Sequence, residues 1–133
     1  ILDLCIDYCS QRKQFGRALS KFQAIQHQIS EMAVELAASS AALSKITNSE
    51  DFYKNNKDIA ILKIRAGSAA GKIIAISHQV HGAIGFTQEY ELAYFTRNLN
   101  SWRNDFGNES YWEDFLGKDF LEKNNQNLWE YLT

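Results

Sequence analysis

The chain has 133 residues, and its 14 Lys and Arg against 16 Asp and Glu give a formal net charge of −2, which argues against a broadly basic nucleic-acid binder. Hydrophobic residues make up 45% of the chain, which disfavours intrinsic disorder. With no proline and only seven glycines, a small sandwich or barrel lacks turn residues, so long helices are expected. The longest wholly apolar runs, such as residues 59–62 and 73–76, are too short for a membrane span.

Apolar residues recur with helical spacing along most of the chain. The pattern predicts helices at roughly residues 1–12, 21–47, 57–82, 88–104 and 109–117. The second helix is expected to bury the stripe Phe22, Ile25, Ile29, Met32, Leu36, Ser39, Leu43 and Ile46. Between the helices we expect a short loop at 13–19 and a polar loop at 47–58. The predicted fold is all-α, an antiparallel up-down four-helix bundle at 1–118 with a short extra C-terminal helix, and 119–133 form a weakly helical tail.

Local signals place the helix ends. Ser20 and Gln23 have the spacing of a capping box at the second helix. Thr87 is a plausible N-cap of the fourth helix and Asn108 of the fifth. Glycines are expected to end three helices. Gly82 and Gly85 end the third, Gly107 ends the fourth and Gly117 ends the fifth.

Several residues suggest contacts beyond the bundle. Small residues fill 37–42 and 66–71, which permits close helix packing. Five apolar residues lie off the main stripes: Val34, Ala38, Ile61, Ile64 and Ile74. They indicate either an oligomer or interdomain face, or an ordinary bundle core. Because the chain opens on an apolar stripe at Ile1, we expect it to be a piece of a longer protein.

The cysteines and histidines do not indicate a disulfide framework or a metal site. Cys5 and Cys9 are four residues apart on a predicted helix, so we expect two buried thiols and a reducing, cytoplasmic location. His78 and His81 share one helical face but lack a third ligand nearby, so no metal site is predicted.

Charge is unevenly distributed. From residue 8 to 30 there are four cations, Arg12, Lys13, Arg17 and Lys21, and no acid. Residues 104–133 carry seven acids and two lysines. The cationic stretch surrounds Gly16 and leads into a helix start, which fits either a phosphate site or a solvated basic turn.

Three motifs occur in order. Residues 8–17 read Y-C-S-Q-R-K-Q-F-G-R, residues 79–90 read Q-V-H-G-A-I-G-F-T-Q-E-Y, and residues 95–98 read F-T-R-N. Together they resemble the signatures of the acyl-CoA dehydrogenase family. The resemblance covers roughly residues 1–117 and implies its C-terminal helical domain. It also implies an FAD-dependent oxidoreductase of fatty acid metabolism that desaturates the CH–CH bond of acyl-CoA thioesters, working as a homodimer or homotetramer.

The resemblance assigns roles to seven residues. Arg12 matches the arginine that meets the phosphates of FAD, often across a dimer interface. Gln14 and Phe15 match residues that line the cofactor, and Gln23 matches a polar residue on the adenylate side. Gln79 and Gly82 match residues that contact the ADP part of a neighbour's cofactor, where Ala83 replaces the family's second glycine.

The resemblance leaves the catalytic residue unknown. The family's usual carboxylate precedes a glycine as Glu-Gly-Thr, but here the triplet is Phe106-Gly107-Asn108, and phenylalanine accepts no proton. Glu109 lies three residues later. The base could instead lie before Ile1, or the chain could be a non-catalytic partner subunit.

Overall fold

The computed structural model describes residues 1–48, 56–123 and 127–132. Six helices are present among these residues: α1 (Leu2–Gln11), α2 (Gln23–Thr47), α3 (Asn56–His81), α4 (Glu91–Asn104), α5 (Glu109–Glu122) and α6 (Leu128–Leu132). Strands β1 (Lys13–Gln14) and β2 (Arg17–Ala18) form a small hairpin, and η1 (Leu19–Lys21) and η3 (Gly82–Phe86) are 3-10 turns. The predicted all-α fold is confirmed. No helix in the described part of the chain is long and apolar enough to cross a membrane.

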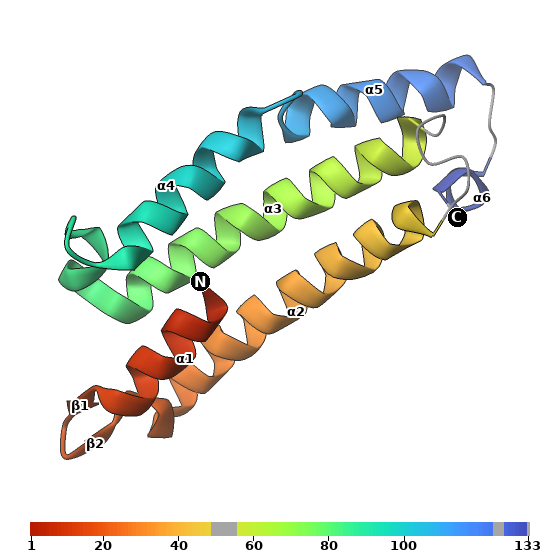
Figure 1. Cartoon of the computed structure of the whole chain (residues 1–133). Helices are drawn as coiled ribbons and strands as arrows, with labels where there is room; N and C mark the ends of the chain where they lie inside the picture. The colour runs from red at the N-terminus through yellow and green to blue at the C-terminus, as the bar shows by residue number, and fades with distance from the viewer. Residues whose placement is uncertain (49–55, 124–126, 133) are drawn as a thin grey trace.

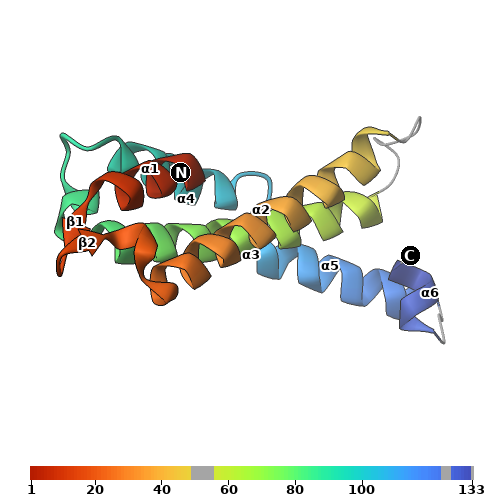
Figure 2. The same cartoon turned by 90° about the horizontal axis from the view of Figure 1, so that it is seen from below.

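Helix α3 is the centre of the bundle, since it contacts α1, α2, α4 and α5. Helix α2 runs antiparallel along one side of α3, and α1 covers one half of this pair (Figure 1). On the other side of α3, α4 and α5 follow one another and together form the fourth row (Figures 1 and 2). The predicted up-down order is therefore present. The fourth helix of the bundle is interrupted between α4 and α5, and α6 is the extra helix.

The core joins α1, α2 and α3 through Cys5, Met32 and Ile73. Around them pack the partly buried residues Ile1, Leu2, Ile29 and Ile76. Both cysteines are buried and free, as expected. The predicted stripe on α2 is wrong at Leu36 and Leu43, which are 47% and 49% exposed, whereas Ile46 at its end is buried.

Glu35 is buried on α2 where the apolar stripe predicted Leu36. Its carboxylate forms ion pairs with Arg65 and Lys72 of α3, and the Lys72 Nζ lies 2.6 Å from Glu35 Oε1. A buried carboxylate is tolerable when cations neutralise it. The α2–α3 contact therefore includes a charged triad.

Two predicted caps are wrong. Helix α2 begins after Phe22, whose side chain forms no cap, and Ser20 lies in η1. Helix α4 begins after Tyr90, because the Thr87 hydroxyl donates to the Ile84 carbonyl, 2.9 Å away, within the preceding turn. The Thr87 hydroxyl thus bonds within the preceding turn and does not cap α4.

The cap of α5 is confirmed, since Asn108 Oδ1 accepts a hydrogen bond from the Tyr111 amide at 3.0 Å. Helix α5 then continues past Gly117 to Glu122, so that predicted end is wrong. It passes through residue 118, where the bundle was expected to end, and the division into bundle and tail stays a prediction. The predicted polar loop falls mostly on 49–55, outside the described residues.

We predict that Glu35→Ala lowers the free energy of unfolding by about 1–3 kcal/mol, because it leaves Arg65 and Lys72 without their shared acceptor. Both cations are partly exposed, so water compensates in part. Urea denaturation measures the change.

Glu31→Ala is the matched control, because Glu31 is exposed on the same helix. It should change stability by no more than about 0.5 kcal/mol. Equal effects of the two substitutions would show that the triad contributes nothing specific.

Candidate functional site

The predicted loop after α1 is a β-hairpin in which Lys13 pairs with Ala18 and Gln14 pairs with Arg17. Its two-residue turn is Phe15-Gly16, and both residues have positive φ, 52° and 81°. This combination matches the type I′ turn, whose twist suits a tight hairpin. Phenylalanine rarely adopts that conformation, so the hairpin holds Phe15 in strain.

A groove of about 460 Å³ opens where the end of α1 meets the end of α3. It is lined by Arg12 and Gln14 from the hairpin side and by Gln79, Gly82 and Ala83 from α3 and η3. Five of the seven predicted site residues, far apart in the sequence, thus face one space.

The other two predicted residues lie outside this groove. Phe15 is 88% exposed, and its ring packs edge-on against Phe22 with ring centroids 6.1 Å apart. Gln23 begins α2 and is exposed. In this chain alone, neither residue lines the groove.

The groove is suited to an anion. No residue of the described part of the chain accepts a hydrogen bond from the Arg12 guanidinium, so its planar donors remain available. Gly82 ends α3 with a φ of +63°, and a side chain built on it would meet open space. Ala83 has no positive φ, so its methyl group adds no backbone strain.

His81 forms one wall of the groove and is a residue that sequence reasoning missed. Its ring is 4% exposed and stacks on Tyr8, with centroids 4.3 Å apart and planes at 27°. Nδ1 lies 2.8 Å from the Ser77 carbonyl, to which it can only donate, and Nε2 lies 3.1 Å from the Tyr90 hydroxyl. Burial lowers the pKa of His81, so the ring is neutral and accepts from Tyr90.

His78 faces a different neighbourhood. Its Nε2 lies 3.0 Å from Thr96 Oγ1, and its ring stacks on Phe86 at a centroid distance of 4.1 Å. The two histidines are thus held by separate partners. Among the described residues, no three His, Cys, Asp or Glu side chains gather as metal ligands.

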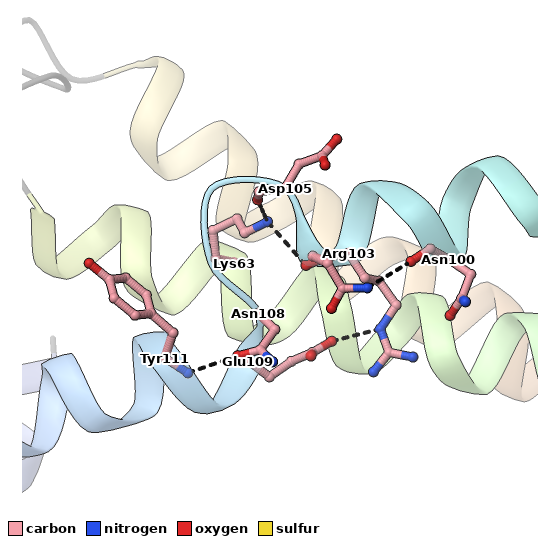
Figure 3. Close-up of polar contacts among 8 residues, drawn as sticks. Lys63, Asn100, Arg103, Asp105, Asn108, Glu109 and Tyr111 are labelled. Carbon is pink, nitrogen blue, oxygen red and sulfur yellow. Dashed lines mark hydrogen bonds and ion pairs between the residues drawn. The ribbon is translucent and has the colours of Figure 1, made fainter.

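The turn between α4 and α5 carries Phe106, which is 93% exposed with a φ of +58° and precedes Gly107 with a φ of +96°. Figure 3 shows the Lys63 side chain bonded to carbonyl oxygens at the end of α4 and in this turn. Lys63 Nζ donates to the Asp105 carbonyl at 2.7 Å, and Trp112 Nε1 donates to the Phe106 carbonyl at 3.1 Å. The exposed Phe106 ring therefore projects from a turn whose carbonyl groups are bonded by two side chains.

Glu109 follows the turn and pairs with Arg103, whose Nε lies 2.8 Å from Glu109 Oε1 (Figure 3). The hydrogen bond from Arg103 lowers the pKa of Glu109. The carboxylate therefore stays ionised and bonded to Arg103. The pair lies over Gly67 and Gly71 of α3, where a methyl group would press on either side chain. The small residues of α3 thus make room for this ion pair, and Glu109 is not a free base.

Comparison with known proteins gives concordant matches. A family model described as acyl-CoA dehydrogenase, C-terminal domain, matches residues 1–112. Glutaryl-CoA dehydrogenase of Desulfococcus multivorans is 36% identical over 99 residues, which make up 73% of this chain and 25% of that protein. The caffeyl-CoA reductase-Etf complex subunit CarC of Acetobacterium woodii is 34% identical over 98 residues, 73% of this chain and 26% of that protein.

Solved structures agree on the fold. A glutaryl-coenzyme A dehydrogenase in complex with glutaryl-CoA superimposes with a TM-score of 0.83 at 31% identity, covering 91% of this chain and 31% of that chain. The ChsE4-ChsE5 complex from Mycobacterium tuberculosis gives a TM-score of 0.84 at 17% identity, covering 91% of this chain and 33% of that chain, which supports the fold alone. The chain spans about a quarter of the length of the curated relatives it matches.

The neutral His81 makes stability depend on pH. The unfolded chain takes up a proton on this histidine near pH 6.5, whereas the folded chain resists it. We predict that the free energy of unfolding falls as the pH is lowered from about 7 to about 5, by at most about 1.4 kcal/mol per pH unit for one proton. Urea denaturation across this range measures the slope.

His81→Gln should flatten the slope, while His27→Gln, at an exposed position on α2, should leave it unchanged. A slope that survives in His81→Gln would assign the pH dependence to other groups.

Proposed function

The chain belongs to the acyl-CoA dehydrogenase family and matches its C-terminal domain, and on this basis we propose that the groove binds the pyrophosphate and ADP part of FAD. The observation that carries the proposal is the meeting of Arg12 and Gln14 with Gln79 and Gly82 in one groove. These residues come from the first two of the three motifs.

The donor set of the groove fits a dinucleotide phosphate. Arg12 offers a planar guanidinium without a protein partner, and the amides of Gln14 and Gln79 offer further donors. Lys13, Arg17 and Lys21 add positive charge, and no acid occurs between residues 8 and 30. When bound, FAD supplies the acceptor for the hydride that leaves the β-carbon of an acyl thioester.

The reaction we propose for the whole protein is α,β-desaturation of an acyl-CoA substrate. This chain contributes cofactor binding and assembly rather than proton transfer. Phe106 has no proton-accepting group, and Glu109 is already paired with Arg103. The α-proton must therefore pass to a carboxylate elsewhere in the protein.

Assembly is the second part of the proposal. Val34 is 66% exposed on α2, and Leu36 and Leu43 lie exposed on the same helix. Exposed apolar side chains favour association when a partner covers them. We propose a homodimer or homotetramer in the cytoplasm.

A second candidate function follows from Phe106, which cannot accept a proton. In this alternative the protein is a non-catalytic partner subunit of the same fold. Anaerobic addition of an acyl-CoA to the flavin-loaded protein separates the two candidates. Loss of the absorbance of the oxidised flavin supports the enzyme. Stoichiometric flavin that no acyl-CoA reduces supports the partner subunit.

We predict that Arg12→Ala weakens FAD binding by about ten- to a hundredfold in the protein that contains this domain, because one charge-assisted contact is worth about 1.5–3 kcal/mol. Arg12→Lys should be intermediate, since an ammonium retains the charge without the planar fork. Bound flavin per protomer and FAD titration measure the effect.

Arg17→Ala is the matched control. It removes the same charge from the hairpin, but the Arg17 guanidinium packs on the Phe22 ring at 4.1 Å instead of lining the groove. Its effect on flavin affinity should be less than about threefold. Equal losses in both variants would reduce the role of Arg12 to general positive charge.

A further inference from the structure

Tyr8 connects the two walls of the groove. On the α1 side, its carbonyl accepts a hydrogen bond of 2.8 Å from the Arg12 amide at the end of the helix. On the α3 side, its hydroxyl donates to the His81 carbonyl, 3.4 Å away, in the peptide unit that leads into Gly82. Both Arg12 and Gly82 line the groove. The spacing between them therefore depends on where Tyr8 is held.

The His81 ring holds Tyr8 in place. It stacks on the Tyr8 ring and also contacts the Tyr90 ring, at a centroid distance of 5.2 Å. Both of its nitrogens are bonded, since Nδ1 donates to the Ser77 carbonyl and Nε2 accepts from the Tyr90 hydroxyl. Gly85 closes a further side, because a methyl group built on it would lie 3.0 Å from the His81 Cβ. Packing and hydrogen bonds thus define one position for the ring.

The cluster around His81 lies inside this chain. His81 is 4% exposed, and Cys5, whose Sγ lies 4.0 Å from Nδ1, is fully buried. The Arg12 guanidinium differs, because no acceptor in the described part of the chain bonds it. Its backbone alone thus determines where its donors begin. The link from His81 through Tyr8 to Arg12 does not depend on what covers the open side of the groove.

We propose that His81 is a positioning residue of the groove, which holds the Arg12 guanidinium at the distance from Gly82 that suits a diphosphate. The inference deepens the proposed function and rests on it. His81 acts through Tyr8 and the backbone of Arg12, and not by contact with the phosphates. A binding group that is held before the ligand arrives loses less freedom on binding, so affinity depends on the groups that hold it.

A double-mutant cycle for FAD affinity tests this role in the protein that contains the domain. His81→Phe keeps an aromatic ring against Tyr8 but removes both hydrogen bonds of the imidazole. It should raise the FAD dissociation constant by about three- to tenfold, which is the range expected for one lost hydrogen bond. In an Arg12→Ala background the same substitution should change the dissociation constant by less than about twofold, because the guanidinium that His81 positions is absent.

Tyr90→Phe repeats the cycle with a smaller change. It removes only the hydroxyl that donates to His81 Nε2 and leaves the ring, so it disturbs the fold less than His81→Phe does. It should raise the FAD dissociation constant by about two- to fivefold, again only when Arg12 is present.

Glu35→Ala is the matched control for stability. Glu35 pairs with Arg65 and Lys72 in the α2–α3 contact, and none of these three residues lines the groove. The substitution should lower the melting temperature, as His81→Phe does, but leave the FAD dissociation constant within about twofold of the unmodified protein.

Equal losses of affinity from His81→Phe with and without Arg12 overturn the positioning role, because His81 would then act independently of the guanidinium. An unchanged dissociation constant in both His81→Phe and Tyr90→Phe, while circular dichroism shows both folded, overturns it too. So does a loss in Glu35→Ala that matches the loss in His81→Phe. Failure of the proposed function looks different: the unmodified protein then binds no FAD, or Arg12→Ala alone leaves FAD affinity unchanged, and the inference falls with it.

Discussion

Close packing against α3 is the constraint on which the rest of this structure depends. Gly67 and Gly71 let the Arg103–Glu109 ion pair lie directly on the helix, and Lys63, one turn earlier, bonds the carbonyl groups of the α4–α5 turn. On the opposite side, Arg65 and Lys72 neutralise the buried Glu35 of α2. Helix α3 thus fixes the positions of its neighbours in two ways. Its glycines make room for side chains of α4 and α5, and its charged side chains bond to α2 and to the α4–α5 turn.

The same helix determines the candidate site. Gly82 takes a left-handed φ and ends α3, so Gln79 and Ala83 face the hairpin that follows α1. His81 closes the wall of the groove between Tyr8 and Tyr90 and stays neutral because it is buried. The result is a groove whose formal charge comes from Arg12, which suits a ligand that carries negative charge.

The sequence predicted the helices, because apolar periodicity and turn glycines are local signals. It did not predict that residues of the first two motifs line one groove, which only the tertiary structure shows. It did not predict the buried Glu35, since its two partners lie on another helix and only tertiary contacts reveal the pairing. The capping box at Ser20 and the N-cap at Thr87 failed for a related reason: Ser20 lies within a 3-10 turn, and the Thr87 hydroxyl bonds back into the turn before it. His81 was missed because nothing local distinguishes it from His78. The hairpin was missed because Phe15 is a poor residue for the conformation it adopts.

We propose that the groove between the α1 hairpin and the end of α3 receives the diphosphate of a nucleotide. Titration of the ¹⁵N-labelled chain with ADP, followed by backbone amide chemical shifts, measures this binding. We expect saturable shifts at Gln14, Gly82 and Ala83, with α5 unaffected. Shifts confined to other surfaces, or no shift at millimolar ADP, would contradict it.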